Sequence, residues 1–239
     1  PTVNHRDTAS MLLDSGCHVM VEKPITTTVD EAAELIAMAD GKGLVLAVGH
    51  VEFHNPAVQA ALARVDGVRY LETQRLSPFT ARSIDVDVIL DLMIHDLQIM
   101  LAVAGETPSE IRAIGVPVLT DKVDQCHAWI EFPGGLVANL TASRVSSERI
   151  RKLRLFGGEA YFSVDYAEQS VRSAGLVRTE SGIEIVPRVI EVEKEEPLKA
   201  ELEAFVAACG GQGSSHVEGR TGAAALAAAI EIRELVDSR

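Results

Sequence analysis

Three side chains that could take part in proton transfer stand in two short motifs. The first motif is Glu22-Lys23-Pro24, in which a lysine follows an apolar run, and the second is Asp91-Leu92-Met93-Ile94-His95. Asp91 and His95 are one helical turn apart, so on a helix they share a face with about 6 Å between them. A lysine, an aspartate and a histidine in one cleft are the parts needed to remove a proton from an alcohol while a hydride leaves.

Each motif also has an ordinary structural explanation. A lysine at the end of a strand is commonly a solvated surface residue, and a single Asp-x-x-x-His pair is commonly an exposed salt bridge. The rest of this helix is apolar, however, so two polar groups on it need a reason. Histidine, with an ordinary pKa of about 6.5, suits a general base, and Asp91 could orient it or hold a substrate hydroxyl. The pair could also bind a metal, but further ligands at a suitable spacing are not evident, so we expect none.

The elements that must position Lys23 are predicted by residues 1–50. The expected elements are a helix over 7–13, a strand over 18–22, a helix from a capping box at Thr28 to about Gly43, and a strand over 44–48. Apolar strands that alternate with helices indicate a parallel sheet, and Lys23 then lies at its carboxyl edge, where ligands bind. The glycine loop of a dinucleotide-binding fold is not in the sequence. We therefore expect residues 1–50 to be only the C-terminal half of a Rossmann-type parallel sheet.

Residues 51–239 show a different pattern, which indicates an α+β domain. Asn55-Pro56 predicts the start of a helix that runs to about 65, because asparagine favours the N-cap and proline the first turn. The other expected helices are 86–104, 198–208 and 221–236, and the expected strands are 68–76, 109–116, 126–132, 135–144, 150–157 and 159–164. Successive strands with short turns predict an open, mostly antiparallel sheet flanked by helices. Residues 176–196 alternate too weakly to be assigned.

The composition excludes several classes of function. The 239 residues carry a formal net charge of −13, which argues against binding to nucleic acid and to anionic membranes. We see no signal peptide and no apolar run near the roughly 20 residues of a membrane span, so we expect no membrane association. The three cysteines are far apart and form no CxxC pair. We therefore expect neither disulfides nor zinc, and a cytoplasmic location.

Further polar residues could extend a site in this crevice. His50 and His54 flank the expected joint between a strand and a helix, although a capped loop histidine is the more usual explanation for each. A basic cluster consists of Arg144, Arg149, Arg151, Lys152 and Arg154. This cluster could hold a phosphate, because arginine forks match it, and a solvated strand face or a subunit contact fits equally well. His127 and Trp129 share one face of an expected strand, and we predict that they pack in the sheet.

The two motifs together resemble those of a known family. Glu22-Lys23-Pro24 with Asp91-x-x-x-His95 is similar to the signatures of the glucose–fructose oxidoreductase/inositol dehydrogenase family, Gfo/Idh/MocA. Pro1-Thr2-Val3-Asn4-His5 resembles the family's Thr-Pro-x-x-x-His cofactor turn, and the tail is similar at Glu196-Pro197-Leu198 and Glu218-Gly219-Arg220. The resemblance covers nearly the whole chain and lacks the family's first stretch, on the order of 75 residues.

The resemblance implies hydride transfer between NAD or NADP and a sugar or cyclitol hydroxyl. Residues 1–50 would be part of the NAD(P)-binding Rossmann domain, and residues 51–239 the substrate and oligomerisation domain. Lys23 and His95 would act at the reacting hydroxyl, His95 as general base, with Asp91 orienting the sugar. The implied cofactor contacts are Thr2, His5, Glu22, Lys23 and Pro24, and the implied substrate contacts are His54, Asn55 and Arg144. A homodimer or homotetramer through the C-terminal sheet is also implied.

Finer features resemble one branch of the family, which oxidises the 3-hydroxyl of UDP-N-acetylhexosamines. The stretch from Asp85 to Asp96 and the stretch from Ala138 to Arg144 are similar to that branch. Two departures are visible, since Asp85-Val86-Asp87 replaces the usual glycines and Phe53-His54-Asn55-Pro56 replaces Arg-Phe-Asn-Pro. The alternatives are an inositol or free-sugar dehydrogenase and, in another class, a truncated, non-catalytic sugar-binding or interaction protein. NAD and NADP are not separated by the sequence.

Overall fold

The first fifty residues fold into a small parallel sheet with two helices. The computed structural model describes residues 1–239 except 81–85, 159, 180–181, 214 and 239. The elements are a 3-10 turn (Thr2–Asn4), α1 (His5–Asp14), β1 (Val19–Glu22), α2 (Val29–Lys42) and β2 (Leu46–Gly49). Strands β1 and β2 run parallel, with Glu22 opposite Gly49. This arrangement confirms the predicted half of a Rossmann-type sheet.

Helix α2 begins and ends where local signals predict. The Thr28 side-chain oxygen accepts a hydrogen bond from the Glu31 N–H at 3.2 Å, and the Glu31 carboxylate accepts one from the Thr28 N–H at 3.2 Å. This reciprocal pair is the capping box that satisfies otherwise unpaired N–H groups. At the other end Gly43 has φ 63°, a left-handed conformation that glycine adopts without steric cost.

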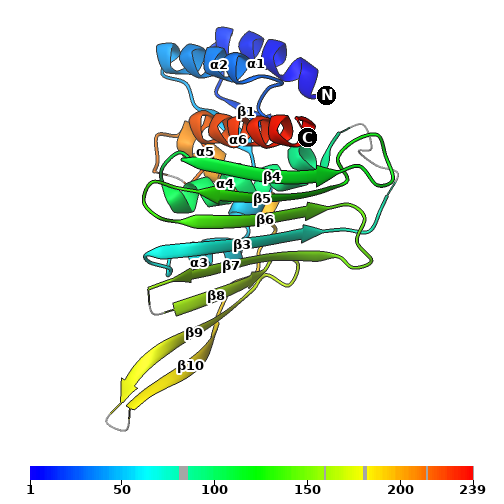
Figure 1. Ribbon diagram of the computed structural model, residues 1–239. Coiled ribbons are helices and arrows are strands. Elements are labelled where there is room, and N and C mark those ends of the chain that lie inside the picture. Colours follow the sequence, from blue (N-terminus) through cyan, green and yellow to red (C-terminus); the bar gives the residue numbers. More distant parts are fainter. Residues whose placement is uncertain (81–85, 159, 180–181, 214, 239) are drawn as a thin grey trace.

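An eight-stranded sheet forms the larger part of the molecule, in the order β10-β9-β8-β7-β3-β6-β5-β4 (Figure 1). The strands are β3 (Val68–Leu76), β4 (Glu110–Val116), β5 (Gln125–Glu131), β6 (Val137–Ser143), β7 (Ile150–Gly157), β8 (Ala160–Asp165), β9 (Ser170–Thr179) and β10 (Gly182–Ile190). Strands β3 and β6 pair in parallel, and every other neighbouring pair is antiparallel. The predicted open, mostly antiparallel sheet is confirmed.

Helices gather on one face of this sheet. They are α3 (Pro56–Leu62), α4 (Ile94–Ala104), α5 (Pro197–Cys209) and α6 (Gly219–Asp237). Helix α6 packs on α4 and β4, α3 packs on β8 and β9, and α5 packs on a 3-10 turn, Val51–His54. Two bounds differ from the prediction, because α3 ends at Leu62 and the helix expected from 86 begins with a π-helical turn, Ile89–Met93. Asp85 lies outside the described residues.

The opposite face of the sheet carries exposed side chains. Along β5 the buried residues are Cys126, Ala128 and Ile130, while His127 and Trp129 between them are exposed. The prediction that His127 and Trp129 pack in the sheet was therefore wrong. They do share one face, as expected, but that face is not covered by the helices, so His127 bonds to Thr141 and Trp129 to Glu131 at the surface.

Strands β9 and β10 form a hairpin that projects beyond the rest of the sheet, in yellow in Figure 1. Large apolar side chains of β10, including Ile183, Ile185 and Val189, are exposed. Alternation of apolar and polar residues indicates a strand with one buried face and one solvent-exposed face. Most of β10 is exposed on both faces, which is why residues 176–196 could not be assigned from alternation.

Helix α6 joins the small sheet to the large one. Leu226 of α6 belongs to the apolar cluster of the first fifty residues, whereas Ala225 and Ile232 of the same helix belong to the cluster under the large sheet. A Cβ added to Gly222 would stand 2.4 Å from Cγ2 of Val48, so only glycine permits this close approach. Because α6 packs on both parts, the domain boundary at residue 50 stays a prediction.

Candidate active site

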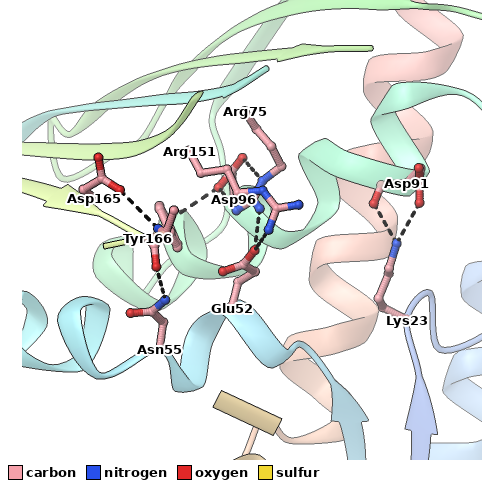
Figure 2. A network of polar contacts seen from close by, with 10 residues as sticks. Lys23, Glu52, Asn55, Arg75, Asp91, Asp96, Arg151, Asp165 and Tyr166 are labelled. Atoms are coloured by element: carbon pink, nitrogen blue, oxygen red, sulfur yellow. Dashed lines mark hydrogen bonds and ion pairs between the residues drawn. The ribbon is translucent and has the colours of Figure 1, made fainter. Parts of the chain in front are cut away.

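Lys23 and Asp91 meet, although they are far apart in the sequence. Nζ of Lys23 donates to the backbone carbonyl oxygen of Asp91 at 2.6 Å and to its carboxylate Oδ1 at 3.2 Å (Figure 2). Lys23 follows β1 at the carboxyl edge of the small sheet, and Asp91 lies in the π-helical turn before α4. The two motifs singled out in the sequence therefore come together, and the ammonium group holds the turn that carries Asp91.

The π-helical turn is itself built by a side-chain cap. The Asp87 carboxylate oxygen Oδ1 accepts hydrogen bonds from the N–H groups of Ile89 at 3.0 Å and Leu90 at 2.9 Å. These are N–H groups that the start of a helix leaves unpaired. Turns of this kind are rare and frequently occur at functional sites. Asp87 is thus one of the residues that place Asp91 in front of Lys23.

His95 is partly exposed, while its Nδ1 is buried without a hydrogen-bond partner. Burial, followed by the positive charges of Arg75 and Lys23, lowers the pKa of His95 well below 6.5. The imidazole is therefore neutral at pH 7 and keeps a lone pair for a proton. A general base must be unprotonated before it acts, so this environment suits the role predicted for His95.

A buried ionic network fixes the helical turn that carries His95 (Figure 2). Asp96, the next residue, accepts from Nε of Arg75 at 2.9 Å and from Nη2 at 2.8 Å, a two-pronged pair. Arg75 also bonds to Glu52 at 2.8 Å and lies over the Tyr166 ring, 5.1 Å from its centroid. Sequence reasoning missed these residues. The available signal was an arginine, Arg75, on the side of the predicted strand that Leu71 and Thr73 turn toward the core.

A cavity of about 980 Å³ opens beside this site. Four residues with a predicted role line this cavity, namely Thr2, Lys23, Pro24 and Asp91. Among the described residues that line it, His95 is not included. The opposite wall comes from the C-terminal end of α6, including Arg233 and Asp237, and from the segment between β4 and β5, Pro117 to Val123. Pockets of about 300–1,000 Å³ hold drug-sized ligands, so this cavity is large enough for substrate and cofactor groups.

The residues expected to contact the cofactor gather at the carboxyl end of β1. His5 Nδ1 lies 2.9 Å from the carbonyl oxygen of Pro24, so α1 is tied to the turn after Lys23. Glu22 is exposed, and its Oε2 would stand 3.1 Å from a Cβ on Gly49, which shows how close the carboxylate lies to β2. This edge is where dinucleotides bind in doubly wound sheets, so the residues fit the predicted role.

The three residues expected to contact substrate are placed in the interior instead. Asn55 is 2% exposed, caps α3 through the Ala57 N–H and donates to the Tyr166 carbonyl oxygen. His54 is buried, and burial together with the charge of His216 lowers its pKa to about 4. The polar atoms of Asn55 are used in holding the fold and His54 is buried, so a substrate contact by either residue is a prediction that the geometry does not favour.

Arg144 is also buried, so the geometry does not favour its predicted contact with substrate, although Arg149 of the same basic cluster is exposed. Its Nε lies 3.5 Å from the Asp124 carboxylate, and its Nη2 donates to the carbonyl oxygen of Val86. Burial would raise the pKa of Asp124, but bonds from three backbone N–H groups lower it to about 2. Arg144 therefore braces a wall of the cavity. Among its neighbours, Arg151 reaches the Glu52 carboxylate from β7.

The described residues show neither a metal-binding cluster nor a membrane-spanning helix. Among them, no group of three or more histidine, cysteine, aspartate or glutamate side chains could hold a metal ion. Within the same residues, no helix has the length and apolar character needed to cross a membrane.

The fold and the site define a class of dinucleotide-dependent oxidoreductase, in which a lysine beside a Rossmann-type strand meets an aspartate and a histidine at the start of a helix. Residues 1–50 match the family model described as "Oxidoreductase family, NAD-binding Rossmann fold". Residues 57–163 match the GFO/IDH/MocA C-terminal domain. The chain belongs to the Gfo/Idh/MocA oxidoreductase family, which confirms the resemblance seen in the sequence.

Individual relatives agree with this assignment. The chain is 40% identical to the UDP-N-acetylglucosamine 3-dehydrogenase of Acidithiobacillus ferrooxidans, over 100% of this chain and 77% of that protein. A crystal form of that enzyme superposes with a TM-score of 0.91 and 39% identity, covering 100% of this chain and 76% of the other. The scyllo-inositol 2-dehydrogenase of Bacillus subtilis is 25% identical over 61% of this chain and 47% of its own length. An Azotobacter vinelandii inositol dehydrogenase homologue with NADH and myo-inositol shares the fold, with a TM-score of 0.81 and 16% identity over 100% and 74% of the two chains.

Proposed function

We propose that this protein oxidises the 3-hydroxyl of a UDP-N-acetylhexosamine and passes the hydride to NAD or NADP. The observation that carries the proposal is the contact of Lys23 with Asp91, one turn before a neutral His95. The 40% identity to a UDP-N-acetylglucosamine 3-dehydrogenase over the whole chain supports the substrate. A bound nicotinamide nucleotide would supply the hydride acceptor, and the cluster of Thr2, Lys23 and Pro24 along the cavity fits such a group.

Each of the three side chains has a distinct role in this reaction. The Lys23 ammonium group can donate a hydrogen bond to the oxygen of the reacting hydroxyl and stabilise negative charge that develops there. His95 takes the proton of that hydroxyl. The Asp91 carboxylate lines the cavity and can accept a bond from a neighbouring sugar hydroxyl while it holds Lys23 in place.

The test is a steady-state assay of the full-length protein with UDP-N-acetylglucosamine and either nucleotide. We expect His95→Ala to lower kcat at least a hundredfold, in the range of general acid–base contributions. We expect Lys23→Ala to lower kcat similarly, whereas Lys199→Ala, at an exposed lysine of α5 that does not line this cavity, leaves kcat within about twofold. Normal turnover by Lys23→Ala or His95→Ala would disprove the assigned roles.

The substrate class has its own test. An inositol or free-sugar dehydrogenase remains the second candidate, since the chain is also 25% identical to a scyllo-inositol 2-dehydrogenase over 61% of its length. If the UDP group is recognised, N-acetylglucosamine without UDP gives a much lower kcat/KM than the nucleotide sugar. Equal values for both compounds would exclude the nucleotide-sugar assignment.

We further propose a cytoplasmic homo-oligomer that associates through the open face of the sheet. The rings of Tyr70 and Phe156 lie 5.5 Å apart, and those of Phe156 and Tyr161 lie 4.8 Å apart, so an aromatic row crosses this face. Aromatic side chains are enriched at subunit interfaces. All three cysteines are free thiols, which supports a reducing compartment. Sedimentation velocity of wild type and Phe156→Glu tests the interface, and we expect the variant to dissociate.

A further inference from the structure

A buried histidine, His50, touches the proposed catalytic one. His50 follows β2 and is 1% exposed, and its ring meets the ring of His95 edge to face, with centroids 5.7 Å apart and planes at 88°. The two residues come from different parts of the fold, one from the small sheet and one from the helix beside the large sheet. No role has been assigned to His50 so far.

Three ring nitrogens in this pair are buried without a hydrogen-bond partner. They are Nδ1 and Nε2 of His50 and Nδ1 of His95. A buried polar atom left unpaired costs roughly 1–3 kcal/mol, and such atoms are normally satisfied by protein or by an ordered water. A buried water needs two to four polar partners, and two touching imidazoles provide them. The arrangement therefore points to a water that bridges His95 and His50.

Burial, helped by the charges around the pair, keeps both rings neutral. Burial, then Lys23 and then His54, lower the pKa of His50 to about 3. Burial also lowers the pKa of His95, followed by the charges of Arg75, Lys23, His50 and Arg151. A neutral imidazole has one donor nitrogen and one acceptor nitrogen, so each ring can take a proton on one side and release one on the other.

We propose that His50 relays the proton that His95 takes from the substrate hydroxyl, through a bridging water, away from the crevice. This inference rests on the function proposed above. It explains why a histidine with two unpaired nitrogens is kept in the interior next to His95. It also provides an exit for the proton while substrate and nucleotide occupy the crevice side of the site.

The proton balance of the relay is complete. The hydroxyl O–H bond breaks, its proton goes to Nε2 of His95, and the hydride leaves the same carbon for the nucleotide. His95 returns to its neutral form by giving the proton on Nδ1 to the water, which passes a proton to His50. His50 then gives the proton on its other nitrogen to a second ordered water, because that nitrogen too lacks a protein partner, and both rings return to their starting tautomers by exchange with these waters. One proton leaves per turnover, and no oxidant or reductant beyond the nucleotide is needed.

The decisive experiment replaces His50 in the full-length protein. His50→Phe keeps a ring and removes both nitrogens, and His50→Gln keeps a donor and an acceptor but cannot pass a proton on readily. His18→Phe is the matched control, because His18 is an exposed histidine just before β1 whose ring accepts the Val45 N–H, at 2.8 Å, and does not line the active-site cavity. We expect kcat of both His50 variants to fall at least tenfold in dilute buffer, to recover partly with added imidazole, and to show a larger D2O effect than wild type. The control should behave as wild type.

Two results would overturn the relay. One is an unchanged kcat in both His50 variants, and the other is a lowered kcat that depends on neither imidazole nor D2O, as expected of a structural role only. A wild type with no activity on nucleotide sugars would count against the proposed function instead. The relay then still has a test by nitrogen NMR of labelled histidine, in which His50→Phe should shift the Nδ1 signal of His95, and an unshifted signal would refute the contact.

Discussion

Asp96 binds Arg75 through both of its carboxylate oxygens, at 2.8 and 2.9 Å, and both side chains are buried. The pair joins β3 to α4 directly behind His95. Glu52 and Tyr166 complete the network from two further segments, with the Tyr166 hydroxyl 3.5 Å from Asp96 Oδ1. The position of the proposed base therefore depends on an ionic contact that lies outside the cavity.

Breaking this pair should destabilise the protein strongly. Arg75→Met leaves the buried Asp96 carboxylate without its ionic partner, and removing one member of a buried pair costs about 3–5 kcal/mol. Chemical denaturation of the variant measures this loss of unfolding free energy. Arg112→Met is the control, because Arg112 pairs with Glu131 on the exposed face and such pairs contribute about 1 kcal/mol or less. Equal losses in the two variants would contradict the role of the Arg75–Asp96 pair.

The pH profile of kcat/KM should reflect the environment of His95. Its pKa is lowered well below 6.5 by burial and by Arg75 and Lys23, so the imidazole stays unprotonated as the pH falls through 6.5. We expect the acid limb of kcat/KM, which reports the free enzyme, to lie below pH 6.5. An acid limb at or above pH 6.5 in wild type would show that the base titrates like an ordinary histidine.

Glu201 should make stability fall as the pH rises. It is 2% exposed, its Oε1 has no hydrogen-bond partner, and burial followed by the charge of Glu22 raises its pKa to about 7. Between the ordinary value of 4.5 and about 7, the folded protein keeps a proton that the unfolded chain has lost. The unfolding free energy therefore decreases with pH in this window, by up to about 1.4 kcal/mol per pH unit.

Glu201→Gln should remove this part of the pH dependence. We expect the variant to be more stable than wild type at pH 8 and to lose that advantage near pH 4.5. Glu203→Gln, on an exposed position of the same helix, serves as the control and should differ little from wild type at either pH. A Glu201→Gln stability difference that is the same at both pH values would contradict the buried-proton explanation.

Replacement by alanine should change the melting temperature in opposite directions at two glycines inside helices. A Cβ at Gly222 of α6 would stand 2.4 Å from Val48 Cγ2, whereas a Cβ at Gly41 of α2 would meet nothing within 4 Å. Overpacking costs about 1–3 kcal/mol, so Gly222→Ala should lower the melting temperature. Gly41→Ala should raise it, because alanine favours a helix by up to about 1 kcal/mol over glycine. Two variants with the same shift would contradict the close packing of α6 on β2.

Local signals determined much of the fold from the sequence by itself. Thr28 and Gly43 set the two ends of α2, and the strand predicted at 68–76 has the bounds of β3, because each of these features depends on residues a few positions apart. The motif residues Lys23, Asp91 and His95 could also be picked out from the sequence, because the side-chain type alone determines which groups can donate or accept a proton.

Only the tertiary structure decided what these residues contact. Lys23 and Asp91 are separated by 68 positions, and Arg75 and Asp96 by 21, so no local pattern could pair them. Arg144, His54 and Asn55 looked available for substrate, yet folding buries them against partners from other segments. Burial and long-range contact are properties of the packed chain, because they depend on which elements lie side by side. The pairing of His50 with His95 is a further contact of this kind.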